Sequence, residues 1–162
     1  METPSIRELL DLSSSRPTVV SATATIPELV AHMIEDRRTH EVYVNDVDGH
    51  YLGLITAQRL AHAVFSYRLP GAGSAIELLD LLSSETADHL LIRESISIHE
   101  DEPLTRAIEL MFRAGLVELP VLDDDRTIVG NVNLLDILAA WKDGRLVNNH
   151  RSPDPDRPPT RG

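Results

Sequence analysis

The sequence predicts an α/β (α+β) fold in which two pseudo-symmetric β-α-β-β-α repeats pack through their small sheets. The first observation is a duplicated segment, because "EVYVNDVDGHYLGLIT" at Glu41–Thr56 returns in outline as "ELPVLDDDRTIVGNVN" at Glu118–Asn133. The second is an amphipathic stripe with helical spacing before each copy, and the third is a helical segment after each copy. A fixed repeat determines the architecture, so we expect two small units that bury their sheets against each other.

Each repeat begins with a short strand and an amphipathic helix. The strands are expected at Thr18–Val20 and Ile96–Ile98. In both helices that follow, apolar residues recur at i, i+3, i+4, i+7 and i+8, which places them on one side of the helix. These residues are Ile26, Leu29, Val30, Met33 and Ile34 in the first repeat, and Leu104, Ala107, Ile108, Met111 and Phe112 in the second.

A hairpin and a closing helix complete each repeat. The strands expected from apolar alternation are Val42–Val44 and Leu52–Ile55, and then Leu119–Leu122 and Val129–Val132. The intervening sequences, "NDVDG" and "DDDRT", are rich in residues whose side chains close turns. The closing helices are expected at Ala57–Ser66 and Leu134–Trp141.

Three segments lie outside the repeats. A short helix is expected at Ser5–Leu12, and a "PGAG" break followed by the helical run "SAIELLDLLSS" connects the repeats. The last segment, "RSPDPDRPPTRG", is rich in proline and has no core residue, so we expect it to be disordered. The expected divisions are a first domain at 6–68, a connecting segment with a helix at 69–89, a second domain at 90–142 and a disordered tail at 143–162.

Composition and charge exclude several classes of protein. The chain has 162 residues, a net charge of −11, 4% aromatic residues and no cysteine. The negative charge disfavours binding to nucleic acid or to an anionic membrane, and few aromatic rings are available for base stacking. No stretch is apolar over the length of a membrane helix, and Met1–Leu10 lacks the apolar core of a signal peptide. We therefore expect a cytoplasmic protein without disulfides or thiolate metal sites.

The order of these features resembles a pair of cystathionine-β-synthase (CBS) domains, which is called a Bateman module. The resemblance covers about residues 6–142 and rests on the duplicated unit, the "LPV" strand, the acidic turn and a glycine (Gly53, Gly130) followed by a short polar motif. It is closest in "DEPLTRAIELMFRAGLVELPVLDDDRTIVGNVNLLDIL", whereas the first repeat has Tyr43 where the family usually has proline. The resemblance implies a cleft between the repeats that binds adenine nucleotides or related adenosyl ligands.

In the polar motif, the resemblance implies a Ser or Thr that serves phosphate and, three residues later, an Asp that binds both ribose hydroxyls. "TAQR" begins with Thr56 but has Arg59 at the Asp position, whereas "NLLD" begins with Asn133 and ends with Asp136. A carboxylate accepts hydrogen bonds and a guanidinium cannot, so Asp136 is the expected ribose ligand, with Asn133 and Thr56 in the phosphate positions. The alternative for Asp136 is a carboxylate that stabilises the start of its helix. Arg59 could clamp a phosphate, and the favoured alternative is a solvated helix charge or a dimer salt bridge.

The resemblance places the residues before the second strand of each repeat at the floor of the cleft. These are Thr39, His40 and Glu41 in the first repeat, and Leu116, Val117 and Glu118 in the second. Two glutamates would repel a phosphorylated ligand by about 1 kcal/mol per pair of charges at about 4 Å in water, and by more when shielded from water. A neutral adenosyl ligand, or a cation held by Glu41, Glu118 and His40, avoids this repulsion. The simpler alternative to a cation site is that both glutamates are exposed at strand edges.

We therefore expect a non-catalytic regulatory or sensor module that binds AMP, ADP, ATP or S-adenosylmethionine. The sequence has no nucleophile or metal-ligand signature that would support catalysis. The resemblance also implies a homodimer through helices Ala57–Ser66 and Leu134–Trp141. The apolar residues expected at that interface are Leu60, Val64, Ile137, Leu138 and Trp141. The alternative is a degenerate pair without a bound nucleotide, which serves as a structural dimerisation module or regulates a transporter or enzyme in trans.

Overall fold

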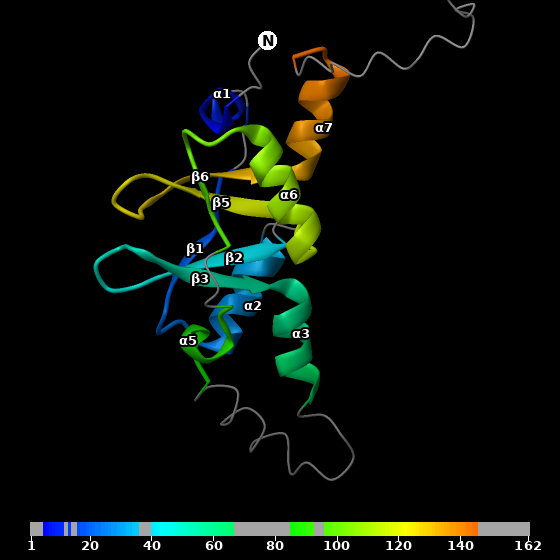
Figure 1. Ribbon diagram of the computed structural model, residues 1–162. Helices are drawn as coiled ribbons and strands as arrows, with labels where there is room; N and C mark the ends of the chain where they lie inside the picture. The colour runs from blue at the N-terminus through cyan, green and yellow to red at the C-terminus, as the bar shows by residue number, and fades with distance from the viewer. Residues whose placement is uncertain are drawn as a thin grey trace, which may run out of the picture.

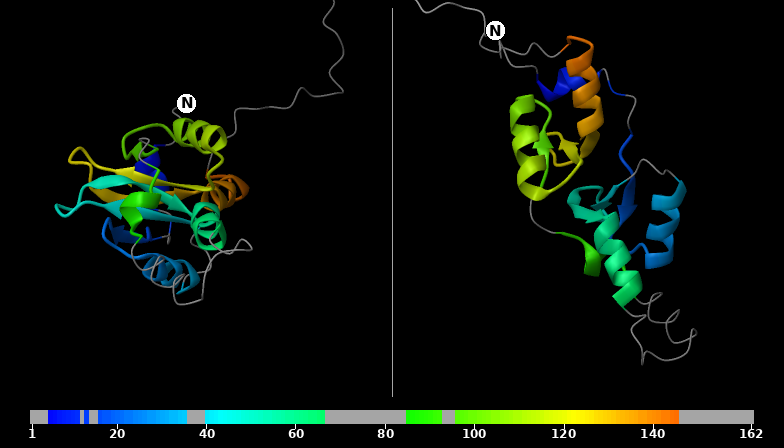
Figure 2. Two further views of the ribbon diagram at one scale, coloured as in Figure 1. Left: turned by 90° about the horizontal axis from the view of Figure 1, so that it is seen from below. Right: turned by 90° about the vertical axis from the view of Figure 1, so that its right-hand side faces the viewer.

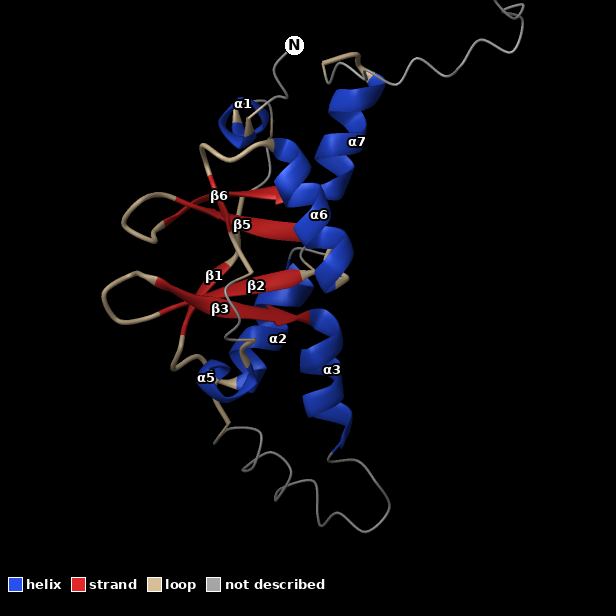
Figure 3. Cartoon of the chain, viewed as in Figure 1, coloured by secondary structure: helices blue, strands red, loops and turns tan. Residues whose placement is uncertain are grey.

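The computed structural model contains two three-stranded sheets, one in each repeat (Figures 1 and 3). It describes residues 5–11, 13, 16–35, 40–66, 85–92 and 96–145. The first repeat consists of β1 (Val19–Ser21), α2 (Ile26–Glu35), β2 (Glu41–Asn45), β3 (Tyr51–Thr56) and α3 (Ala57–Ser66). The second consists of β4 (Ile98–His99), α6 (Leu104–Ala114), β5 (Glu118–Leu122), β6 (Ile128–Asn133) and α7 (Leu134–Lys142). The predicted β-α-β-β-α order is confirmed in both repeats.

The two sheets have the same topology. In each sheet the first strand pairs in parallel with the middle strand, and the middle strand pairs antiparallel with the third. The pairing aligns Glu41 with Thr56 in the first repeat and Glu118 with Asn133 in the second. The polar residues that the sequence singled out therefore lie side by side at the same end of each hairpin.

Alternating residues of β2 contribute to two hydrophobic cores. Val42 and Val44 pack in a core within the first repeat. Tyr43 points to the opposite face and joins Leu54 in a core whose other members come mostly from the second repeat. Figure 2 (left) shows the sheets stacked face to face. The expectation that the two sheets cover each other is therefore confirmed, and burial of apolar surface holds the repeats together.

The amphipathic helices bury only part of the stripe that the sequence predicts. The buried members are Ile26, Leu29, Leu104, Ala107 and Met111. Ile34 and Phe112, which end the two stripes, are 64% and 72% exposed. The eighth residue after the first is rotated by about 80° around the helix axis, so it leaves the buried side.

A short helix precedes each repeat and the two helices are exchanged. α1 (Ile6–Leu10) lies against β6 and α7 of the second repeat. α5 (Ala87–Leu90) lies against the first repeat, where the amide of Ala87 donates to the carbonyl of Ala24 at 2.8 Å. Figure 1 shows both helices at their exchanged positions. Each repeat is therefore completed by a segment that leads into the other.

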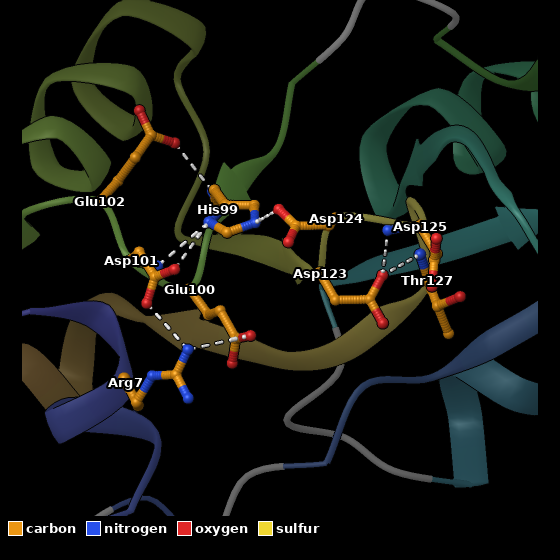
Figure 4. A network of polar contacts seen from close by, with 9 residues as sticks. All are labelled: Arg7, His99, Glu100, Asp101, Glu102, Asp123, Asp124, Asp125 and Thr127. Carbon is orange, nitrogen blue, oxygen red and sulfur yellow. Dashed lines mark hydrogen bonds and ion pairs between the residues drawn. The ribbon is translucent and has the colours of Figure 1, made fainter.

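A polar network fixes α1 on the second repeat (Figure 4). Arg7 of α1 forms ion pairs with Glu100 at 3.1 Å and with Asp101 at 2.8 Å. The amide of Asp101 donates to Nδ1 of His99 at 3.2 Å, so Nε2 carries the proton that is donated to Asp124 at 2.9 Å. Exposed ion pairs contribute little stability individually, so this network mainly orients α1.

Two predicted features lie outside the described residues. They are the helix in "SAIELLDLLSS" and residues 146–162 of the expected disordered tail, and both remain predictions. The first residues of that tail, 143–145, form a turn after α7, where the amide of Gly144 donates to the carbonyl of Trp141 at 3.0 Å. Within the described ranges, no helix has the length and apolar character needed to cross a bilayer.

Candidate functional site

The predicted site residues lie where the hairpins end and the closing helices begin. In the first repeat the amide of Ala57 donates to the carbonyl of His40 at 2.8 Å, and in the second the amide of Leu134 donates to the carbonyl of Val117 at 2.8 Å. His40 and Val117 are both exposed and occupy equivalent places beside α3 and α7. Thr39 lies outside the described residues, so its role stays a prediction.

Glu41 and Glu118 meet at the contact between the repeats. They are 3% and 4% exposed. Glu118 Oε1 accepts a hydrogen bond from the amide of Glu41 at 3.2 Å, and Glu41 Oε1 accepts one from the amide of Val117 at 3.5 Å. The hypothesis that both glutamates are exposed at strand edges is therefore wrong. Both carboxyls lie on strand faces that the opposite sheet covers.

Burial changes the protonation of this pair. Removal of the Glu41 carboxyl from water, together with the negative charge of Glu118 beside it, raises the pKa of Glu41 to about 8. Glu41 is therefore protonated at neutral pH. A protonated Glu41 removes one of the two negative charges that a pair of glutamates would carry in water. The repulsion that the sequence predicts for a phosphorylated ligand is correspondingly reduced.

Two more polar side chains complete a buried group, which we call the interface cluster: Glu41, Tyr43, Glu118 and Asn131. Tyr43 and Asn131 are 0% and 2% exposed, and Asn131 Nδ2 donates to Glu118 Oε2 at 3.1 Å. Burial and the neighbouring charges of Glu118 and Glu41 raise the pKa of Tyr43 well above its ordinary value. Among the described residues, none forms a hydrogen bond with Glu41 Oε2, the Tyr43 hydroxyl or Asn131 Oδ1.

Asp136 lies in the first turn of α7, close to the residue that caps this helix. Asn133 Oδ1 accepts the amide of Leu135 at 2.7 Å, while Asn133 Nδ2 donates to Glu118 Oε2 at 3.5 Å. Asp136 Oδ2 accepts a hydrogen bond from the hydroxyl of Ser13 at 2.7 Å. Its place in the first turn suits a carboxylate that stabilises the start of the helix. A half-buried carboxylate that accepts one hydroxyl is also able to accept those of a ribose.

The equivalent residues of the first repeat are used differently. Thr56 Oγ1 accepts the amide of Arg59 at 3.1 Å and so caps α3. Arg59 is exposed, and its Nε donates to the carbonyl of Leu90 at the end of α5. Arg59 therefore forms a hydrogen bond within its own chain, and none of the roles considered from the sequence included this contact. Arg59 thus contacts the segment that leads into the second repeat, at Leu90, and Asp136 contacts the segment that leads into the first, at Ser13. We call these two segments the entry segments.

Three residues of this region were not predicted from the sequence. Period-two alternation places Tyr43 on the same strand face as Glu41, so a polar inward face could have been recognised. The same alternation, combined with the pairing of Asn131 to Pro120, indicates an inward amide in β6. Ser13 has no local signal, because it lies 123 positions from its partner Asp136.

A group of metal-binding side chain types lies in the turn between β2 and β3. Ligand atoms of Asp46, Asp48 and His50 all lie within 4.8 Å of one another. Asp46 Oδ1 accepts the amides of Asp48 and His50, both at 2.9 Å. An aspartate that bonds the backbone two residues later is a common way to close a turn. The turn explains this grouping, and we assign no metal to it.

Comparison with solved structures places the fold among CBS domain pairs. A CBS domain-containing protein from Thermotoga maritima is 29% identical, with a TM-score of 0.71 over 88% of this chain and 97% of that one. The CBS domain pair of protein MJ0100, solved in complex with 5′-methylthioadenosine and S-adenosyl-L-methionine, is 22% identical, with a TM-score of 0.66 over 88% of this chain and 98% of that one.

Curated relatives share only a part of their length with this chain. The L-aspartate semialdehyde sulfurtransferase of Methanocaldococcus jannaschii is 27% identical over 127 residues, which are 78% of this chain and 22% of that protein. Protein sds23 of Aspergillus niger is 27% identical over 137 residues, which are 82% of this chain and 26% of that protein. The model of the CBS domain matches residues 6–66 and 87–143, one match for each structural repeat. The chain therefore belongs to the CBS domain family and forms a tandem CBS domain pair, a Bateman module.

Proposed function

We propose that this CBS pair is a non-catalytic regulatory module that binds one adenosyl ligand per chain on the Asp136 side. The observation that carries the proposal is the asymmetry between the repeats. Asp136 presents a carboxylate to which a hydroxyl is already bonded, whereas the equivalent Arg59 has only donors, one of which is used by Leu90. The complex of the MJ0100 pair with two adenosyl compounds motivates this ligand class.

The charge of the site favours an adenosyl group without a phosphate chain. Asn133 occupies the position where the motif has a hydroxyl, and it donates to the buried carboxylate of Glu118. Among the described site residues, only His40 and Arg59 could supply positive charge, and Arg59 is bonded to α5. A ligand of the S-adenosylmethionine type therefore fits better than ATP.

A ligand at Asp136 has a short route to the contact between the repeats. Asn133 caps the helix that carries Asp136 and donates to Glu118, and Glu118 accepts the amide of Glu41 in the other repeat. A displacement of the α7 start would therefore be transmitted to the interface cluster. The ligand shifts the relative orientation of the repeats only to the extent that it binds one orientation more tightly.

Calorimetry with S-adenosylmethionine, 5′-methylthioadenosine, AMP and ATP tests this proposal. We expect one site per chain and a loss of about ten- to a hundredfold in affinity for Asp136→Ala, because a hydrogen bond to a charged group contributes about 1.5–3 kcal/mol. The matched control is Arg59→Ala, the equivalent position of the first repeat, which should change the affinity much less. Two equal sites, or wild-type affinity in Asp136→Ala, would contradict the assignment.

We infer further that the module is a homodimer through α3 and α7. Leu135, Leu138 and Trp141 of α7 are 72%, 51% and 53% exposed, an apolar surface on a helix that its own repeat leaves open. Two predicted interface residues do not belong to this surface, because Leu60 and Ile137 are 4% and 5% exposed and pack in the cores of their own chain. The interface is therefore proposed mainly on α7.

The alternative function is a dimerisation module, or an in-trans regulator of a transporter or enzyme, that binds no nucleotide. It is favoured because the polar side chains of both motifs already form hydrogen bonds within the chain. Thr56 and Asn133 cap helices, and Arg59 and Asp136 are hydrogen-bonded to entry segments. A dimer without binding to any of the four compounds would select this alternative.

A further inference from the structure

We propose that Glu41 and Glu118 form a proton-binding site between the two repeats. The site holds one proton when the repeats are packed, and loss of this proton at alkaline pH weakens their packing. This proposal does not rest on the adenosyl ligand, because neither the geometry of the site nor its test involves one. Its ligand is a proton that is held by one of two carboxyls at equivalent positions of the repeat.

The geometry requires a positive charge or a proton at this place. The two carboxyls are 3% and 4% exposed, and each accepts a backbone amide of the opposite repeat. Among the described residues, no basic side chain forms an ion pair with either. Two adjacent buried carboxylates without a cation would repel each other in a medium that screens poorly. One proton removes this repulsion.

The hydrogen bonds indicate which carboxyl holds the proton. Both oxygens of Glu118 already accept N–H donors, from the Glu41 amide and from Asn131 and Asn133. Glu41 accepts only the amide of Val117, and its Oε2 has no partner among the described residues. A proton on Glu41 converts this unpartnered acceptor into a donor, within a cluster that also holds a second unpartnered acceptor, Asn131 Oδ1.

The groups around the pair reinforce the need for a proton. β2 contributes Tyr43 and the exposed His40 precedes it, β3 contributes Tyr51 further along the sheet, and β6 contributes the neutral Asn131. Burial and the Glu118 charge raise the pKa of Glu41 from 4.5 to about 8. Because the folded pKa is the higher one, the stabilising effect is complete below about pH 4.5 and is lost progressively as the pH rises to about 8.

Urea unfolding between pH 5 and 9.5 tests the proposal with Glu41→Gln, which keeps the shape and a donor but cannot ionise. Because the wild type takes up one proton on folding, each unit of rising pH up to about pH 8 raises its unfolding equilibrium constant by up to about tenfold. Between pH 6 and 8 we expect the ratio of wild-type to Glu41→Gln unfolding constants to rise at least about tenfold, and to level off above pH 8. Glu109→Gln, on the exposed side of α6, is the matched control and should follow the wild type.

A constant ratio between wild type and Glu41→Gln over this range would overturn the proposal. A direct measurement on the wild type tests the proposal even if Glu41→Gln is too unstable to compare. The infrared spectrum of the folded wild type at pH 7 should contain the band of a protonated carboxyl, and this band should disappear near pH 8; its absence at pH 7 would also overturn the proposal. Addition of Na⁺, K⁺, Mg²⁺ or Ca²⁺ at pH 9 should not restore stability. Specific restoration in the wild type, absent in Glu41→Gln, would show a cation site instead.

Discussion

Substitution of Gly53 by alanine should destabilise the module at the crossing between its repeats. Gly53 lies in β3, where the segment that leads into the second repeat passes over the sheet. A Cβ at this position would stand 2.3 Å from the carbonyl oxygen of Ile92 and 2.8 Å from Leu91 Cδ1. The first of these atoms belongs to the backbone, so it cannot move by a simple change of rotamer.

The magnitude follows from the hydrogen bonds that this displacement breaks. The amide of Ile92 donates to the carbonyl of Leu54 at 2.8 Å, and the amide of Leu54 donates to the carbonyl of Ile92 at 3.4 Å. Each bond contributes about 1 kcal/mol, and overpacking adds about 1 kcal/mol or more. Alanine reduces the entropy of the unfolded chain, which offsets about 0.5 kcal/mol. We expect a net loss of about 2.5 kcal/mol, or about 5–10 °C in melting temperature for a chain of this size.

The repeat supplies the control. Gly130 occupies the equivalent position in β6, but a Cβ there would meet Leu10 Cδ2 at 2.8 Å, the end of a flexible side chain. Gly130→Ala should therefore lower the free energy of unfolding by less than about 1 kcal/mol. Both variants can be compared by urea unfolding at one pH. Equal losses for the two variants, or a larger loss for Gly130→Ala, would refute the reasoning from backbone contact.

Two further predictions concern the surface of α7 and the interface cluster. Leu138→Glu should convert a dimer into a monomer in analytical ultracentrifugation, whereas Ile34→Glu, which changes an even more exposed apolar residue of α2, should leave it a dimer. A wild type that sediments as a monomer at high micromolar concentration would contradict this. Tyr43→Phe should leave the free energy of unfolding unchanged or raise it by up to about 1 kcal/mol, because the hydroxyl is buried without a partner among the described residues. Tyr51→Phe should lower it by about 1 kcal/mol, since the Tyr51 hydroxyl donates to the carbonyl of Ile96 at 3.0 Å.

The sequence was sufficient for the order of the elements but not for their exchange between the repeats. Apolar spacing located the strands and helices of each repeat, because these elements are set by local periodicity. The packing of α1 on the second repeat depends on contacts such as that of Arg7 with Asp101, which lie 94 positions apart. Nothing in a local pattern distinguishes an entry helix that packs on its own repeat from one that packs on the other.

The same distinction between local and long-range signals applies to the candidate site. The duplicated motifs identified Asp136 and Arg59 as unequal, which requires only the sequence and the chemistry of donors and acceptors. The burial of Glu41 and Glu118 was not predicted, because glutamate side chains are almost never fully buried and this general tendency outweighed the alternation of the strand. Their burial follows from the way in which the two sheets stack, where equivalent strand ends meet.

A duplicated unit that packs against itself brings each residue near the contact close to its own equivalent. At a position occupied by a glutamate, this arrangement creates a pair of like charges, which is the origin of the Glu41–Glu118 contact. Divergence of the neighbouring positions then decides how the pair is accommodated. Asn131 and Asn133 supply N–H donors to Glu118, while their equivalents in strand register in the first repeat, Leu54 and Thr56, supply none to Glu41 in the described structure. The divergence between the repeats that motivates the proposed ribose site at Asp136 is thus accompanied by a second divergence, at Asn131 and Asn133, which leaves Glu41 as the proposed holder of the proton.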